Sequence, residues 1–105
     1  MPTFIRNIEF FTPDGYPGQV ARCQFALAEY RDDSFPEAGF ALPDHLARAV
    51  PKRRAEYLAG RVLARQLLAP LGFADFTLAR GEDRAPQWPP GIAGALSHNS
   101  HTALC

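Results

Sequence analysis

The chain has 105 residues, of which 47% are hydrophobic, and its 11 basic and 11 acidic side chains leave a formal net charge of zero. This length limits it to one domain, and the hydrophobic fraction excludes a disordered tail. The balanced charge argues against a general electrostatic attraction to nucleic acid or to a membrane.

The opening "MPTFIRNIEFFTPDG" predicts a strand rather than a targeting segment, because it lacks the apolar core of a signal peptide. No later stretch approaches the run of about 20 apolar residues that a membrane span needs. We therefore expect a cytoplasmic protein with Cys23 and Cys105 as free thiols. The strand covers Phe4 to Phe11, and after the turn formers of "TPDGYPG" the partly alternating run "QVARCQFALAEY" predicts a second strand that pairs back as a hairpin.

The next stretch, "RDDSFPEAGFALP", is rich in Pro, Gly and Asp and predicts an irregular connection. Helical spacing of apolar residues then begins near Leu46, with an interruption at Pro51. We expect a short helix near Leu46 and a long one from about Lys52 to Leu68, with Pro51 tolerated in its first turn and Gly72 as its stop.

After the helix, "FADFTLA" predicts a strand and "GIAGALSHNSHTALC" one or two more. These elements predict an α+β fold, in which a small antiparallel sheet packs against one long helix. The chain stops within the apolar run "TALC", and a natural domain seldom ends in the middle of a strand. We therefore expect residues 1–105 to be part of a longer protein.

The long helix carries a basic face, because Arg54, Arg61 and Arg65 are separated by seven and four residues. Two interpretations stay open at this point: a solvated charged face, or a site where guanidinium groups bind phosphate. Gly60 lies beside Arg61, and a helical glycine costs about 1 kcal/mol relative to alanine. A group packed closely against this face would explain the glycine.

The segment "GEDRAPQWPPG" is a rigid loop, because its prolines fix the backbone φ and hold it extended. Such a loop presents Arg84 and the ring of Trp88 to a ligand with little loss of conformational entropy. The alternative interpretation is that Trp88 is a core anchor and Arg84 an ordinary surface charge.

The segment "SHNSH" places Ser97 next to His98. A metal site would need further ligands at usable spacing, and a serine hydrolase would need a nucleophile framed by glycines. A hydroxyl and an imidazole at a strand end are better suited to donate hydrogen bonds to a phosphate oxygen.

The run "KRRAEYLAGRVLAR", followed by "GEDRAPQWPPGIAGALSH", resembles the N-terminal half of a 4′-phosphopantetheinyl transferase of the enterobactin synthase component D type. The resemblance is specific from about Lys52 to Leu104, whereas residues 1–50 carry no diagnostic motif. It implies half of a pseudo-twofold fold. It also implies an enzyme, serving siderophore biosynthesis or a related pathway, that moves 4′-phosphopantetheine from coenzyme A to a serine of an acyl or peptidyl carrier protein. Neither nucleic acid nor membrane is expected as a partner.

The resemblance further implies that six residues line the coenzyme A site: Arg54, Arg61, Arg84, Pro86, Ser97 and His98. In that assignment the two helix arginines face the nucleotide phosphates and the loop arginine reads the 3′-phosphate. The proline lies near the adenine, and the serine and histidine contact phosphate oxygens.

The family's catalytic centre also needs an acidic pair in a "GxDxE" strand that holds Mg²⁺, and a "KE" helix motif, and neither occurs in this sequence. Glu82 and Asp83 belong to a different motif. We therefore expect no catalytic or metal-binding residue in this chain, which alone should be inactive. Within the resemblance, the alternative to a part of a longer chain is a stand-alone half that pairs with another chain. Two alternatives of other classes remain: a non-catalytic module that binds an acidic protein or nucleic acid through the basic helix face, and a structural domain that binds no ligand.

Overall fold

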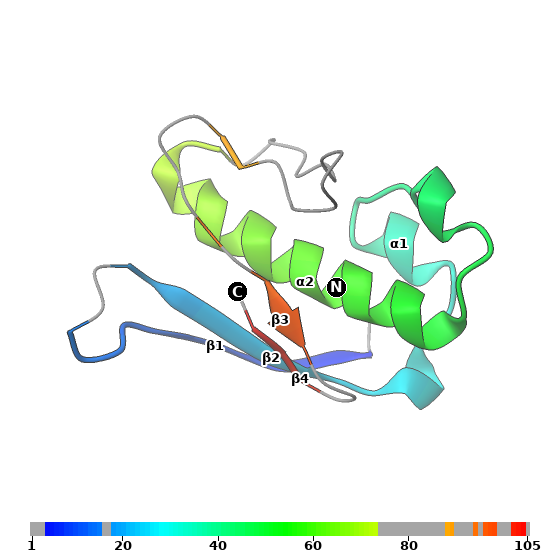
Figure 1. The fold of residues 1–105 in the computed structure, drawn as a ribbon, viewed down its shortest axis with the longest axis horizontal. Coiled ribbons are helices and arrows are strands. Elements are labelled where there is room, and N and C mark those ends of the chain that lie inside the picture. Colours follow the sequence, from blue (N-terminus) through cyan, green and yellow to red (C-terminus); the bar gives the residue numbers. More distant parts are fainter. Residues whose placement is uncertain are drawn as a thin grey trace.

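The computed structural model describes residues 4–15, 18–73, 88–89, 94, 96–98 and 102–104. Within these residues a long helix lies across one face of a four-stranded sheet whose order is β1-β2-β4-β3 (Figure 1). The strands are β1 Ile5–Phe11, β2 Val20–Phe25, β3 Ser97–His98 and β4 Thr102–Leu104, and the long helix is α2 Pro51–Leu68. All neighbouring strands are antiparallel. The predicted α+β fold, with a small antiparallel sheet against one long helix, is confirmed.

The predicted hairpin is present, with a bulge that the sequence pattern did not indicate. Arg6 pairs with Gln24 and Glu9 pairs with Arg22, so that two residues of β1 lie opposite one residue of β2. The first of them, Asn7, has a φ of 55°. Asparagine tolerates this left-handed conformation better than most residues, and here its Nδ2 donates to Oε1 of Gln24 at 2.7 Å.

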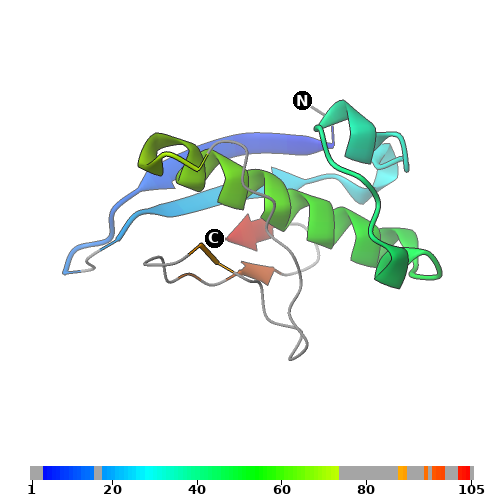
Figure 2. The same cartoon turned by 90° about the horizontal axis from the view of Figure 1, so that it is seen from above.

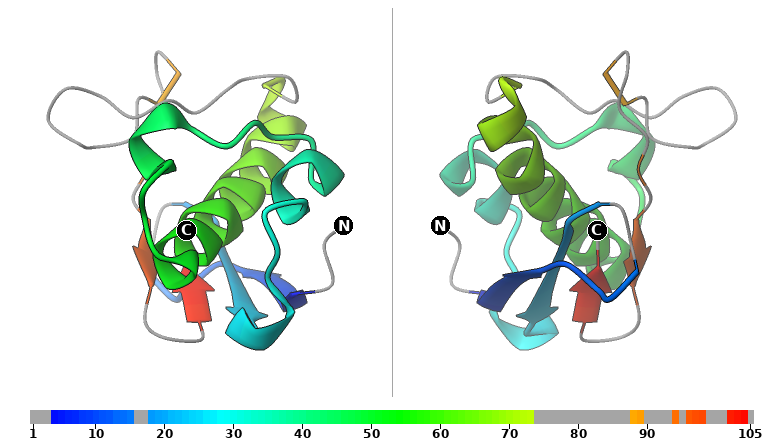
Figure 3. Two further views of the ribbon diagram at one scale, coloured as in Figure 1. Left: turned by 90° about the vertical axis from the view of Figure 1, so that its right-hand side faces the viewer. Right: turned by 90° about the vertical axis from the view of Figure 1, so that its left-hand side faces the viewer.

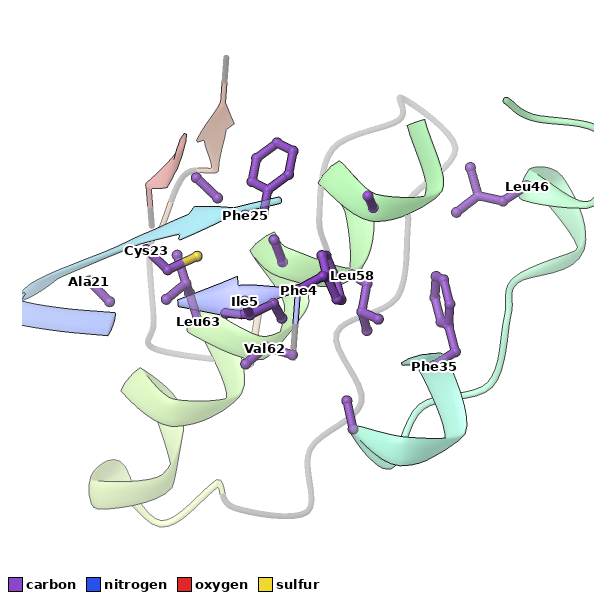
Figure 4. Packing of buried hydrophobic residues seen from close by; sticks show 14 residues of the cluster. Phe4, Ile5, Ala21, Cys23, Phe25, Phe35, Leu46, Leu58, Val62 and Leu63 are labelled. Atoms are coloured by element: carbon purple, nitrogen blue, oxygen red, sulfur yellow. The ribbon is translucent and has the colours of Figure 1, made fainter. Parts of the chain in front are cut away.

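The core lies between the sheet and α2 (Figure 4). Alternate residues of β2, among them Ala21, Cys23 and Phe25, are buried on the face that packs against α2. Burial raises the pKa of the Cys23 thiol to about 11, although a hydrogen bond with the Ala103 backbone acts in the opposite direction. Cys23 is a free thiol, as predicted, and its burial and raised pKa disfavour the reactive thiolate. Cys105, the other predicted free thiol, lies outside the described residues.

The long helix begins and ends close to where the sequence predicts. Pro51 is its first residue, where the missing N–H removes no helical hydrogen bond. A 3₁₀ turn, η3 Ala69–Leu71, follows the helix, and Gly72 then takes a left-handed conformation with a φ of 91°. Glycine adopts this conformation without steric cost, which explains why the helix stops there.

Three predictions between residues 19 and 50 need correction. The run "QVARCQFALAEY", predicted as a strand, is extended only to Phe25 and continues into a 3₁₀ turn, η1 Leu27–Glu29. The segment predicted to be irregular, residues 31–43, contains a short helix, α1 Ser34–Glu37. The helix predicted near Leu46 is only a 3₁₀ turn, η2 Asp44–Leu46. It cannot extend into α2, because Val50 precedes a proline and is held in an extended conformation with ψ near 156°.

Residues 30–47, which we call the strap, cross the N-terminal half of α2 on the side away from the sheet (Figures 2 and 3). Phe35 and Leu46, both buried, anchor the strap to the core. The strand predicted for "FADFTLA" lies outside the described residues. Among the helices that are described, none is long and apolar enough to cross a membrane.

Candidate functional site

Arg54 joins α2 to both ends of the strap. Its Nη1 donates to the two carboxylate oxygens of Asp32 at 3.0 and 2.9 Å. Its Nε donates to the carbonyl oxygen of Leu46 at 3.0 Å, and its Nη2 to that of Ala47 at 2.6 Å. Most of the hydrogen-bonding capacity of this guanidinium is thus used within the chain.

Asp32 is the acidic partner in this arrangement, and no local sequence pattern marks it as one. The hydroxyl of Tyr30 donates to Asp32 Oδ1 at 3.0 Å. The hydrogen bonds from Arg54, and then from Tyr30, lower the pKa of the Asp32 carboxyl, because both favour its charged form. Burial, followed by the hydrogen bond to Asp32, raises the pKa of Tyr30, so its hydroxyl stays protonated and remains a donor.

Arg61 is buried, with only 7% of its surface exposed. Its guanidinium carbon lies 4.2 Å from the centre of the Tyr57 ring, one helical turn earlier. The Tyr57 ring in turn stacks near Phe35, with centroids 6.4 Å apart, and meets the edge of His45 at 5.4 Å. Both of these rings belong to the strap.

Arg65, like Arg54, contacts the strap directly. Its guanidinium carbon lies 4.3 Å from the centre of the Phe40 ring. A Cβ at Gly39 would come within 3.0 Å of Arg65 Nη1, and the φ of 84° at Gly39 also favours glycine. The three arginines therefore do not form an open basic stripe, because the strap contacts Arg54 and Arg65, and Arg61 is buried beside Tyr57.

Arg53, which precedes Arg54, differs from it. Its side chain is exposed, and within the described part of the chain it makes no hydrogen bond or ion pair. Arg53 was not among the residues predicted to bind a ligand. Helical spacing alone cannot separate the two arginines, because their difference arises from the position of the strap.

Gly60 lies where α2 faces the segment that leads into β3. A Cβ built at Gly60 would lie 3.5 Å from Leu96 Cδ2, which is an ordinary van der Waals distance. Leu96 thus leaves room for a methyl group, and its contact does not explain why the helix has a glycine here. Leu96 immediately precedes Ser97 and His98, so the arginine motif of the helix and the Ser-His motif of the strand meet at this contact.

The register of β3 separates Ser97 from His98. Ser97 pairs with Leu104, which pairs with Arg22, whereas His98 pairs with Ala103, which pairs with Cys23. Successive strand positions alternate between the two faces of a sheet. The His98 position therefore belongs to the face that packs on α2, and the Ser97 position to the opposite face.

Only part of the proline-rich loop is described, and Arg84 and Pro86 lie outside it. Trp88 is half-buried and Pro89 is buried. A Cβ at Gly94 would come within 2.6 to 2.8 Å of the six-membered ring of Trp88, so the indole packs directly on the glycine backbone. This contact gives Trp88 a packing role within the domain and leaves part of its surface exposed.

Within the same described residues, no group of three or more His, Cys, Asp and Glu side chains is arranged to hold a metal ion. The part of the chain that can be described thus contributes arginines, an aromatic residue that supports one of them, and the Ser-His strand. Such a set suits an anionic ligand rather than a metal centre.

The fold is an α+β domain in which the helix that carries the arginines also contacts the last two strands of the sheet. Residues 42–105, more than half of the chain, match the family model described as the 4′-phosphopantetheinyl transferase N-terminal domain. The chain therefore belongs to the 4′-phosphopantetheinyl transferase family, which confirms the resemblance found in the sequence.

Curated relatives agree with this assignment. Enterobactin synthase component D of Salmonella typhimurium is 36% identical over 92 residues, which cover 85% of this chain and 39% of that protein. The 4′-phosphopantetheinyl transferase Npt of Nocardia iowensis is 42% identical over 72 residues, covering 69% of this chain and 32% of that protein. The 4′-phosphopantetheinyl transferase PptT of Mycobacterium tuberculosis is 40% identical over 76 residues, covering 70% of this chain and 33% of that protein. The chain thus spans between 32% and 39% of the length of these three relatives.

Proposed function

We propose that this chain is the coenzyme A-binding part of an enzyme that transfers 4′-phosphopantetheine from coenzyme A to a serine of an acyl or peptidyl carrier protein. Family membership supports the transferase class. The observation that carries the proposal is the contact between Gly60 and Leu96, because it brings Arg61 and the Ser97-His98 strand, 36 positions apart along the chain, to one region.

Arg61 is suited to bind a phosphate although it is buried. Its guanidinium carbon lies over the Tyr57 ring. A guanidinium carries its N–H groups at the edge of its plane, in a geometry that matches two phosphate oxygens at once. A side chain held in this way also loses little conformational entropy when a ligand binds.

The other predicted ligand residues remain part of the proposal. Arg84 would read the 3′-phosphate, Pro86 would lie near the adenine, and His98, whose strand position belongs to the face that packs on α2, would contact a phosphate oxygen. The contact of Ser97 with phosphate stays in the proposal as the resemblance implies it, although its strand position belongs to the opposite face. The contacts of Arg54 favour a supporting role for it, since Asp32 and two backbone carbonyls already occupy its donors. The exposed Arg53 is better placed to offer a free guanidinium to a ligand.

Mg²⁺ and the catalytic groups are proposed to come from outside these 105 residues. In the complete enzyme, this domain would be one half of a pseudo-twofold fold, and the acidic pair of a "GxDxE" strand would hold the metal. The metal would neutralise the pyrophosphate while the carrier serine attacks. We therefore propose that residues 1–105 bind coenzyme A and do not complete the transfer.

A mass-spectrometric assay tests the transfer. The 105-residue chain, and separately a longer protein that includes the "GxDxE" and "KE" segments, are incubated with coenzyme A, Mg²⁺ and an apo-carrier protein. Addition of phosphopantetheine to the carrier by the longer protein alone is the expected result. Transfer by the short chain would contradict the division of roles, and transfer by neither would contradict the proposed activity.

Ligand titrations test the residue assignments. We expect Arg61→Ala to lower the affinity for coenzyme A. Arg48→Gln is the control, because Arg48 is exposed and precedes α2, and it should leave the affinity unchanged. Arg84→Ala should lower the affinity for coenzyme A more than the affinity for dephospho-coenzyme A, because only coenzyme A carries the 3′-phosphate. Equal losses for both ligands would overturn the assignment of Arg84.

A further inference from the structure

We propose that Asp32 and Arg54 are positioning residues, which set the orientation of the Arg61 guanidinium through the strap and Tyr57. The part of this inference that concerns coenzyme A affinity rests on the proposed function. The geometric part does not, because it concerns only contacts within the chain.

The first step is the attachment of the strap. Arg54 holds the start of the strap through both carboxylate oxygens of Asp32, and its end through the carbonyl oxygens of Leu46 and Ala47. Only 15% of the Arg54 side chain is exposed, so these hydrogen bonds are partly protected from competing water. One guanidinium therefore fixes both ends of the strap on α2.

The second step is the effect of the strap on Tyr57. Phe35, which lies between the two attachment points, packs nearly parallel to the Tyr57 ring at an interplanar angle of 23°. His45, next to the attached Leu46 carbonyl, meets the same ring edge-on at 71°. Because both neighbours belong to the strap, its attachment restricts the rotamers available to Tyr57.

The third step is the transfer of this restriction to Arg61. The helix fixes the backbone of Arg61, but its long side chain has many rotamers, and the stack on Tyr57 at 4.2 Å selects among them. If the strap loosens, the Tyr57 ring can turn, and the guanidinium loses the contact with this ring. The edge N–H groups would then no longer be held in one direction for a phosphate.

The test uses nuclear magnetic resonance, since a guanidinium over an aromatic ring feels the ring current. In the unmodified chain we expect the Nε–H proton of Arg61 to be displaced upfield by Tyr57. In Asp32→Asn this displacement should shrink. The resonance of Arg22, which lies 5.4 Å from the Phe11 ring outside the strap, should stay in place and is the internal control.

Asp33→Asn is the matched control variant, because it removes the same charge at the neighbouring exposed position. Arg54→Lys is the second test variant, since lysine keeps the charge but cannot reproduce the three-sided set of hydrogen bonds. Circular dichroism at a temperature well below unfolding establishes that each variant is folded. A change that only lowers stability would not move the Arg61 resonance under that condition.

The coenzyme A arm is an isothermal titration of the same variants. We expect Asp32→Asn to weaken coenzyme A binding by about tenfold, less than the roughly hundredfold loss that a misplaced reacting group can cause. Asp33→Asn should bind as the unmodified chain does.

The outcomes of the two arms separate the inference from the proposed function. An unmoved Arg61 resonance in both Asp32→Asn and Arg54→Lys would overturn the inference, whatever the affinity. A moved resonance with unchanged coenzyme A affinity would overturn its functional part. A moved resonance in a chain that binds no coenzyme A even when unmodified would support the positioning of Arg61 and contradict the proposed function.

Discussion

Two arginine–carboxylate pairs of this protein look alike in chemistry and differ in surroundings. Nη1 of Arg54 lies 2.9 Å from Oδ2 of Asp32, where the strap is attached to α2. Nη2 of Arg22 lies 2.6 Å from Oε2 of Glu9, on the outer face of the hairpin. The carboxylates are similarly exposed, at 59% and 56%, but the arginine side chains are 15% and 48% exposed. The shorter pair is therefore the more solvated one.

This difference shows that the distance between two charges does not measure their contribution to the fold. An exposed ion pair contributes about 0 to 1 kcal/mol, because water and salt screen it and two long side chains lose their freedom. Arg54 also donates to two backbone carbonyls, which would lose their partner if it were removed. On α2, Arg54 attaches the strap through Asp32 and two backbone carbonyls. On the outer face of the hairpin, Arg22 and Glu9 form an exposed ion pair.

The largest expected effect comes from the anchor of the strap. Phe35→Ala should lower the free energy of unfolding by about 3 to 5 kcal/mol, because it removes a buried ring that packs against Tyr30 and Tyr57. Urea unfolding measures this loss. Phe11→Ala on the outer face is the control, since its ring is 37% exposed and should cost less than about 1 kcal/mol. Similar losses for the two variants would remove the distinction between the faces.

The next effect separates the two ion pairs directly. Arg54→Ala should lower the free energy of unfolding by about 2 to 3 kcal/mol, since several hydrogen bonds to a charged group are lost together. Arg22→Ala should lower it by less than about 1 kcal/mol. Both values come from urea unfolding under the same conditions, and an equal cost for the two substitutions would contradict the comparison.

A smaller effect of opposite sign is expected at the contact between α2 and β3. Gly60→Ala should raise the free energy of unfolding by up to about 1 kcal/mol, because alanine favours the helix and its methyl group finds ordinary contact with Leu96. Thermal unfolding measures the gain. A loss of stability would mean that the space beside Leu96 is tighter than the contact distance indicates. A gain accompanied by weaker coenzyme A binding would instead assign the glycine to the approach of the ligand.

The smallest expected effect is a pH dependence at the Asp32–Arg54 pair. The pKa of Asp32 is lower in the folded chain, so its contribution is fully present above the ordinary Asp pKa of about 3.9 and is lost as the pH falls through the lowered folded value. Between pH 7 and pH 3 the free energy of unfolding should therefore fall more for the unmodified chain than for the Asp32→Asn variant. Urea unfolding at both pH values measures the difference, and parallel losses would show that Asp32 does not contribute in this way.

Local patterns were sufficient to predict several parts of the fold. The hairpin, the start of α2 at Pro51 and its stop at Gly72 follow from spacing and from the conformational limits of proline and glycine. The bulge at Asn7 was not predicted, because it depends on how the faces of β1 meet the core. The assignments of Arg84 and Pro86 stay predictions, since both lie outside the described residues.

The sequence by itself determined the family, the long helix and the presence of a basic face, because motif spacing and helical periodicity are properties of neighbouring residues. Only the tertiary structure decided that the chain itself holds Arg54 and Arg65 through the strap and buries Arg61, whereas the neighbouring Arg53 is exposed. Asp32 and Arg54 are 22 positions apart, and the strap that begins near Asp32 has no periodic pattern from which its path can be read. Its path is set by the burial of Phe35 and Leu46 against α2, which exists only once the chain has folded.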